Sequence, residues 1–312
     1  MHKIGLPTVL ALTVAIIAIS SSAPMIAYCA APALAIAFWR NTFAVATITP
    51  FAATRQRAEL RALLGPGGRR ALLGCVLAGL WLSAHFGTWV PSAKLTNAAM
   101  ATALVNTTPV WTALLAVLRK VHVPVVTWVG IGISLVGTAL AAGLDMRVSP
   151  HALLGDGLAL AGGLAAAVYT TIGERVRTSV STTAYTLVCY SVCGVVLLGV
   201  SVIGGVRLHG YTGVTWLLIL AMTAGPQLLG HSLFNFSLKR VSATTISVLL
   251  LLEVPGAALI AWLFLHQLPA ARTVPGLVIL VAGVAVVLAG SSRRGQPTKG
   301  GTAISPEAIA TT

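Results

Sequence analysis

Polar and ionisable side chains interrupt an otherwise apolar stretch of the chain, residues 226–255. Gln227, His231 and Asn235 follow one another at intervals of four residues, so they share one face of a helix. A carboxylic acid, Glu253, lies in the apolar segment that follows. Such groups are costly in a lipid-like environment and are usually retained there for function. Their chemistry is that of proton transfer or of binding a polar solute.

The same spacing occurs in the first half of the chain, at Trp81, His85 and Trp89, 146 residues before Gln227, His231 and Asn235. The same offset relates several further pairs without a gap: Pro109 and Pro255, Thr127 and Thr273, Gly130 and Gly276, and Gly137 and Gly283. The sequence therefore predicts two copies of one unit, each about half of the chain.

Two charged residues lie deep within apolar segments. Glu253 is about 16 Å along its helix from the nearer end, close to the middle of a bilayer. It is a candidate for taking up a proton or binding an ammonium group, or else a structural carboxyl near the kink at Pro255. Arg40 needs an anionic partner or a wet cavity. It could pair with Glu253 or bind a solute carboxylate, and the alternative is a side chain that reaches the membrane interface.

The composition places the chain in a membrane. Of 312 residues, 57% are hydrophobic and 8% charged, and the mean hydropathy is +0.92. The net charge of +14 comes from short basic clusters between apolar runs, which indicates membrane topology and not nucleic-acid binding. The four cysteines lie in apolar segments as packing residues, so we expect no disulfide, metal or cofactor.

Ten segments are long and apolar enough to span a bilayer, which needs about 20 residues. They are residues 7–28, 32–53, 71–92, 97–118, 124–143, 152–173, 183–204, 213–236, 242–264 and 272–290. The longest connection is roughly residues 54–70. The sequence thus predicts an all-α integral membrane protein, with a disordered tail at 293–312.

The basic residues also predict an orientation. When the connections are counted alternately, fifteen of the twenty lysines and arginines fall on one side and four on the other. This asymmetry predicts a multi-pass protein of the plasma (inner) membrane with both termini in the cytoplasm. Because each repeat, 1–146 and 147–292, holds five helices, the second must enter the membrane upside down.

Inversion separates the two histidines. It places His85 in the outer half of its helix and His231 in the inner half, so we expect a pseudo-two-fold axis to relate them without contact. Both could relay protons or contact solute, or could be interhelical packing residues. The tryptophans beside His85 would form an aromatic wall and the amides beside His231 a hydrogen-bonding one, with ordinary helix packing as the alternative.

Several motifs together resemble the EamA-type transporters of the drug/metabolite transporter superfamily, over residues 7–290. They are FWRN (38–41), HFGTWVPSAKLTNAAMATALVNTTPVW (85–111), GDGLALAGGLAAAVYT (155–170), PQLLGHSLFNFSLKR (226–240) and LLEVPGAALIAWLFL (251–265). The resemblance implies ten helices around a central cavity that moves small polar metabolites, often amino acids or their relatives, or drugs, commonly outward.

The sequence departs from the family pattern in two places. Val121 and Gln267 stand near the positions where a glutamate often follows the fourth and ninth helices, and Val254 separates Glu253 from the usual proline. The first departure concerns loop structure and the second the orientation of Glu253.

We therefore expect a secondary transporter that works by alternating access, with a small-molecule solute, the bilayer and a proton as candidate partners. The sequence gives neither the substrate nor the oligomeric state. The candidate residues for solute binding or coupling are Arg40, His85, Trp89, Asn106, Gln227, His231, Asn235 and Glu253. The alternatives are an intramembrane enzyme that uses the buried histidines and Glu253, or a scaffold that transports nothing. No nucleophile–base or metal-ligand motif supports an enzyme, and no appended domain supports a scaffold.

Overall fold

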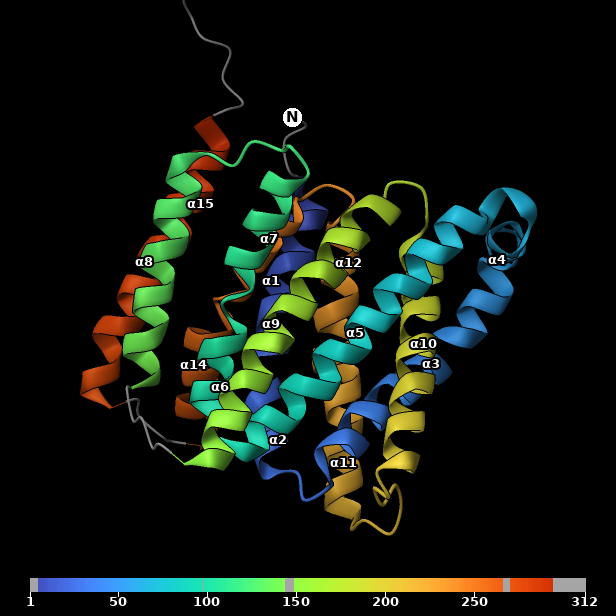
Figure 1. Cartoon of the computed structure of the whole chain (residues 1–312), viewed down its shortest axis with the longest axis horizontal. Helices are drawn as coiled ribbons and strands as arrows, with labels where there is room; N and C mark the ends of the chain where they lie inside the picture. The colour runs from blue at the N-terminus through green and yellow to red at the C-terminus, as the bar shows by residue number, and fades with distance from the viewer. Residues whose placement is uncertain (1–4, 97, 144–148, 266–269, 294–312) are drawn as a thin grey trace, which may run out of the picture.

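The structure is a computed structural model that describes residues 5–96, 98–143, 149–265 and 270–293. The predicted tail therefore lies almost entirely outside the described residues, as does Gln267. The described part is a bundle of helices without strands (Figure 1). In chain order its elements are α1 (Leu6–Ser20), α2 (Ser22–Tyr28), α3 (Ala33–Arg55), α4 (Arg57–Leu64), η1 (Pro66–Gly68), α5 (Arg69–Leu95), α6 (Ala98–Val105), α7 (Thr108–Leu118), α8 (Val125–Ala142), α9 (Pro150–Val176), α10 (Thr182–Ile203), α11 (Gly213–Met222), η2 (Thr223–His231), α12 (Ser232–Ser237), α13 (Ala243–Leu250), α14 (Glu253–Leu265), η3 (Ala271–Thr273) and α15 (Val274–Arg293).

Nine helical segments among the described residues are long and apolar enough to cross a membrane. They correspond to nine of the ten predicted spans. The tenth is α3, whose 23 residues are also long enough. Arg40, Asn41 and several threonines make α3 less apolar than the others, and it packs against α5 and α10 inside the bundle. The prediction of an all-α integral membrane protein is confirmed.

The first predicted span is interrupted at Ser21, between α1 and α2, and three others are interrupted near their middle. The fourth predicted span is two helices, α6 and α7, which meet at Asn106 and Thr107, and the ninth is α13 and α14, which meet at Leu251 and Leu252. Each break precedes one of the equivalent prolines, Pro109 and Pro255, which lack an N–H for the helix ladder. The eighth span contains the π-helix η2 around Pro226. The equivalent part of α5 in the first repeat is an ordinary α-helix.

A close backbone contact between the repeats joins α8 and α15, at one side of the bundle (Figure 1). A Cβ atom added to Gly137 would lie 2.7 Å from the carbonyl oxygen of Gly276, and one added to Gly130 would lie 2.8 Å from that of Gly283. Midway between them, the Ser134 hydroxyl donates a hydrogen bond to the carbonyl of Leu280, 3.3 Å away and 146 residues later. Small residues let the two helices touch backbone to backbone.

These contacts show how the repeats are related. Gly130 is the repeat equivalent of Gly276 but packs on Gly283, while Gly137 packs on Gly276, so the two equivalent helices run antiparallel. The other helix contacts between the repeats obey the same two-fold relation. Helices α3 and α10 pack together, α5 packs along α9, and η2 with α12 packs along α1. A pseudo-two-fold axis perpendicular to these helices relates the halves, which are therefore inverted.

We predict that Gly137→Ala destabilises the protein, because the new methyl would lie 2.2 Å from the backbone nitrogen of Leu280. The overpacking should cost about 1–3 kcal/mol. Gly132→Ala is the matched control on the same helix, since nothing lies within 4 Å of its added Cβ. Thermal unfolding of the purified protein in detergent compares the two. Equal melting temperatures for both variants would contradict the close contact.

Candidate functional site

A cavity lies between the two repeats, with about 70 Å³ of space that water can enter. That is room for a few water molecules at most. Six of the eight residues predicted from the sequence line it: His85, Trp89, Asn106, His231, Asn235 and Glu253. The other lining residues are Ile19, Val105, Thr108, Ala166, Tyr169, Thr170, Phe234, Leu238, Ile246 and Leu250. Both repeats contribute, so relative movement of the repeats would change the shape of the cavity.

Two of the cavity residues lie at the breaks in the interrupted helices. Asn106 lies just before α7, and Glu253 is the first residue of α14. The N-termini of two half-helices therefore begin beside the cavity. Each such terminus has backbone N–H groups without an intrahelical partner and the positive end of the helix dipole. Half-helix ends of this kind form the solute and ion sites of many transporters.

The cavity wall has unused hydrogen-bond donors. The indole Nε1 of Trp89 and the amide Nδ2 of Asn106 are buried and have no hydrogen-bond partner. The Asn106 side chain faces the half-buried carboxyl of Glu253. Because buried donors are nearly always paired, two donors without a partner at the wall of one cavity indicate a place where a ligand or water supplies the acceptor.

His85 and His231 meet at the wall of this cavity. Their ring centroids are 6.2 Å apart, and the Phe86 ring lies 5.1 Å from that of His231. The expectation that they would lie apart is wrong, because equivalent residues come together wherever their helices cross the pseudo-two-fold axis. His85 also stacks on Trp89, with 5.8 Å between centroids.

A hydrogen bond fixes the protonation pattern of His85. Its Nδ1 lies 2.9 Å from the carbonyl oxygen of Gly162 on α9. A carbonyl can only accept, so Nδ1 carries a hydrogen, and in the neutral ring Nε2 is then the acceptor. The neutral His85 ring can thus accept a proton at Nε2.

Asn235 is held from two sides. Its side-chain oxygen accepts a hydrogen bond from the Tyr169 hydroxyl at 2.8 Å, and its backbone carbonyl accepts one from Nε of Arg177 at 2.9 Å. Arg177 is only 3% exposed and also donates to the Val180 carbonyl and the Thr182 hydroxyl. It ties the end of α9 to α10 and α12. Sequence reasoning counted Arg177 among the topology charges and missed this role, because nothing in the sequence distinguishes it from the neighbouring Arg175.

Arg40 and Gln227 lie outside the cavity and bind each other. Nε of Arg40 donates to the Gln227 side-chain oxygen at 2.9 Å, and the Gln227 amide donates to Asn41 at 3.1 Å. The guanidinium carbon of Arg40 also lies 4.6 Å from the centre of the Phe86 ring. Among the described residues no carboxylate is within ion-pair distance of Arg40, so of the two alternatives from the sequence, a pair with Glu253 or binding of a solute carboxylate, the first is wrong. This network joins α3 to η2 behind the cavity wall.

Gln227 leaves the predicted stripe. It lies in the π-helix η2, whose turns are wider than those of an α-helix. His231 and Asn235 face the cavity while Gln227 turns towards Arg40. Trp81 is also outside the cavity and is 38% exposed. It lies about 6 Å from His85 along α5, towards the start of that helix.

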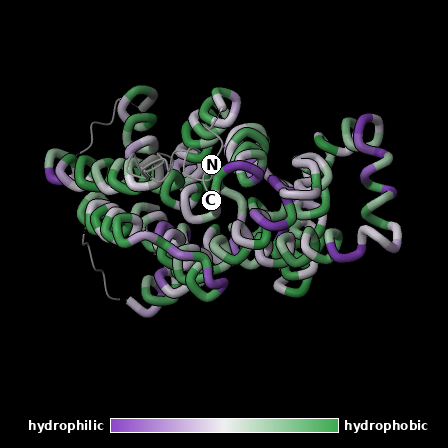
Figure 2. The backbone as a smooth tube through the Cα atoms, turned by 90° about the horizontal axis from the view of Figure 1, so that it is seen from above, coloured by the Kyte–Doolittle hydropathy of each residue, from purple (hydrophilic) through white to green (hydrophobic). Residues whose placement is uncertain are grey.

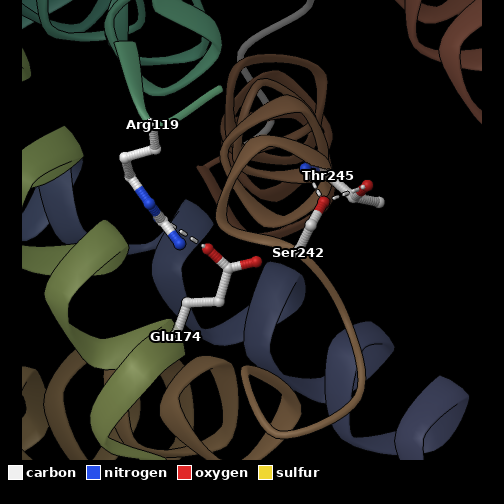
Figure 3. Close-up of polar contacts among 4 residues, drawn as sticks. All are labelled: Arg119, Glu174, Ser242 and Thr245. Atoms are coloured by element: carbon white, nitrogen blue, oxygen red, sulfur yellow. Dashed lines mark hydrogen bonds and ion pairs between the residues drawn. The ribbon is translucent and has the colours of Figure 1, made fainter. Parts of the chain in front are cut away.

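One ion pair bridges the repeats at the end of the bundle where α1 begins. Arg119, which directly follows α7, lies 3.2 Å from the carboxylate of Glu174 near the end of α9 (Figure 3). In the same view Ser242 and Thr245 cap the start of α13, with 2.9 Å between their hydroxyl oxygens. Helices α7, α9 and α13, each of which has residues in the cavity wall, therefore have polar contacts at this end of the bundle.

The arrangement suits reversible binding and proton exchange. Two imidazoles and a carboxyl share one small cavity with unpaired donors and two helix N-termini. The four cysteines are buried and free, away from the cavity. Within the described ranges, no group of three or more His, Cys, Asp or Glu residues could hold a metal ion.

Comparison with known proteins agrees with this architecture. A search of curated proteins gave no match. A solved structure, titled only "Crystal structure of protein", is similar over 93% of this chain and 99% of its own, with a TM-score of 0.75 and 18% identity, which shows a shared fold. The family described as the EamA-like transporter family matches residues 6–143 and again residues 153–289. The members of that family are transporters and not enzymes. The two matches cover most of the chain in two halves, so the chain belongs to the EamA-like transporter family.

Proposed function

We propose that this protein is a secondary transporter that exports a small polar metabolite, such as an amino acid, or a drug, by alternating access. The observation that carries the proposal is the cavity between two inverted repeats, lined by titratable groups at broken helices. In this proposal residues 1–146 and 147–292 are the moving units. Rocking of one against the other opens the cavity to each side of the membrane in turn.

The chemistry of the cavity suggests a role for each side chain. Glu253 takes up a proton or binds an ammonium group. The donors of Trp89 and Asn106, with the nearby N-termini of α7 and α14, bind an acceptor or anionic group of the solute. The His85–Trp89 stack and Tyr169 bind its apolar part. Arg40 and Gln227 hold α3 against η2 and so act only through position.

Transport in proteoliposomes tests the proposal. Labelled amino acids and cationic drugs are offered to reconstituted protein with and without a pH gradient. Movement of an unchanged solute supports a transporter. Conversion of the solute would indicate an intramembrane enzyme, and neither result across the panel would favour a scaffold.

The orientation is part of the proposal: a plasma-membrane protein with both termini in the cytoplasm. We predict that a single cysteine at Arg61→Cys, in the exposed connection between α3 and α5, reacts with an impermeant thiol reagent only after the cells are opened. The four native cysteines are replaced in this variant, so that the introduced cysteine is the one thiol that can react. Reaction in intact cells would reverse the orientation.

We predict that Glu253→Gln reduces gradient-driven transport to background but leaves solute exchange largely intact. The amide keeps the shape of the side chain and cannot carry the proton, which only coupled transport needs. Both activities are measured in the same proteoliposomes. Equal loss of both would assign Glu253 to solute binding or structure, and wild-type behaviour would remove it from the mechanism.

Inversion generates a prediction for His85 and His231. Equivalent residues should exchange environments between states, so His231 should be the more accessible in the inward-open state and His85 in the outward-open state. Single cysteines at His85→Cys and His231→Cys, each without the native cysteines, are labelled from either side with an impermeant reagent. A position that no reagent reaches from either side, or labelling rates that solute leaves unchanged, would make these histidines packing residues.

A further inference from the structure

A cluster of exposed arginines surrounds α4, at one edge of the molecule. Figure 2 shows α4 as a hydrophilic helix set apart from the apolar bundle. All of the arginines on it and beside it are exposed: Arg55, Arg57, Arg61, Arg69 and Arg70. We call these five residues the basic corner. The sequence predicted only a connection at residues 54–70, so helix α4 within it is a finding of the structure.

Helix α4 has two different faces. Leu63 is buried, and Leu60 is partly buried against the core of the bundle. At 100° per residue, Arg57, Arg61 and Leu64 fall together on another side. Leu64 is 73% exposed. These three side chains therefore face away from the bundle, where the two cations can meet lipid phosphates and the leucine can meet acyl chains.

The connection to α5 brings the remaining arginines to the same place. Gly68 approaches the backbone of α4 so closely that an added Cβ would lie 2.5 Å from the Cα of Leu63. The chain can therefore fold back sharply, and α5 begins beside the end of α4 with Arg69 and Arg70. Five positive charges are gathered in one corner instead of being spread along a loop.

These charges are not neutralised within the protein. Glu59 is the acidic residue of α4, and its carboxylate turns inward to accept a hydrogen bond from the backbone N–H of Ser181 at 2.6 Å. The ion pair found among the described residues, Arg119 with Glu174, does not involve the corner. Like charges held together without counter-ions attract anions strongly.

We propose that the basic corner binds the headgroups of anionic phospholipids in the adjacent leaflet. Arg57 and Arg61 contact the phosphates and Leu64 enters the acyl region. Phe51 and Leu73 on the neighbouring helices are exposed as well. Basic residues near an anionic surface each add appreciably to lipid binding. The carboxylate of Glu59 then connects the lipid-bound helix to the start of α10, beside Arg177 and Thr182.

Lipid titration of the purified full-length protein tests the proposal. Phosphatidylglycerol or phosphatidylcholine is added in detergent, and bound lipids are counted by native mass spectrometry. The test variant is Arg57→Gln with Arg61→Gln. The matched control is Lys239→Gln with Arg240→Gln, which removes the same charge from another exposed turn. A third variant, Arg57→Lys with Arg61→Lys, keeps the charge.

We expect phosphatidylglycerol to bind more tightly than phosphatidylcholine and the Gln pair at α4 to weaken its binding about tenfold or more. The control pair should change the affinity less than about twofold, the Lys pair should largely retain it, and equimolar inorganic phosphate should not displace the lipid. Melting temperatures confirm that all variants are folded. Equal weakening by both Gln pairs would reduce the effect to net charge, and equal binding of the two lipids, or displacement by phosphate, would overturn the proposal.

Discussion

The contact between α8 and α15 is the constraint on which the rest of the architecture depends. Glycines at equivalent positions in the two repeats let these helices approach backbone to backbone. Because the helices are equivalent and antiparallel, this contact sets a pseudo-two-fold axis. The same axis passes between the equivalent residues His85 and His231, whose ring centroids are 6.2 Å apart. A larger side chain at any of these glycines would separate the halves and move the walls of the cavity.

Burial alone does not separate functional from structural polar residues in this protein, but position at the cavity does. Arg40, Gln227 and Asn41 are fully buried and bind one another, which stabilises the junction of α3 and η2. Trp89 and Asn106 are also buried, and each keeps a donor without a partner at the cavity wall, whereas the unpaired Nη2 of Arg40 lies away from the cavity. Apolar surroundings make an unused donor costly, so its presence at a cavity is better explained by a ligand than by packing.

Much of this structure could be predicted from the sequence, because it depends on composition and on repetition. The length of the apolar segments predicts the membrane spans. The 146-residue offset predicts two repeats, and the odd number of helices in each predicts that the repeats are inverted. Six of eight proposed site residues line one cavity, since polar side chains in apolar helices tend to face inward.

What the sequence could not show depends on helix geometry and on tertiary contacts. The four-residue spacing grouped Gln227 with His231, and that grouping was wrong because only His231 lines the cavity while Gln227 binds Arg40. The partner of Arg40 is a neutral amide on a distant helix, where charge reasoning suggested Glu253. The breaks before α7 and α14 did leave a signal. Pro109 and Pro255 are equivalent, and this could have been read as paired half-helices.

The most direct test of alternating access between the repeats is a reversible cross-link. Arg119→Cys with Glu174→Cys, in a protein without native cysteines, replaces the ion pair that joins α7 of one repeat to α9 of the other. A bifunctional thiol reagent should abolish transport in proteoliposomes, and reduction should restore it. The same reagent across Ser134→Cys and Leu280→Cys, at the axis, should leave transport largely intact. Undiminished transport with the first pair fully cross-linked would contradict movement of the two repeats against each other.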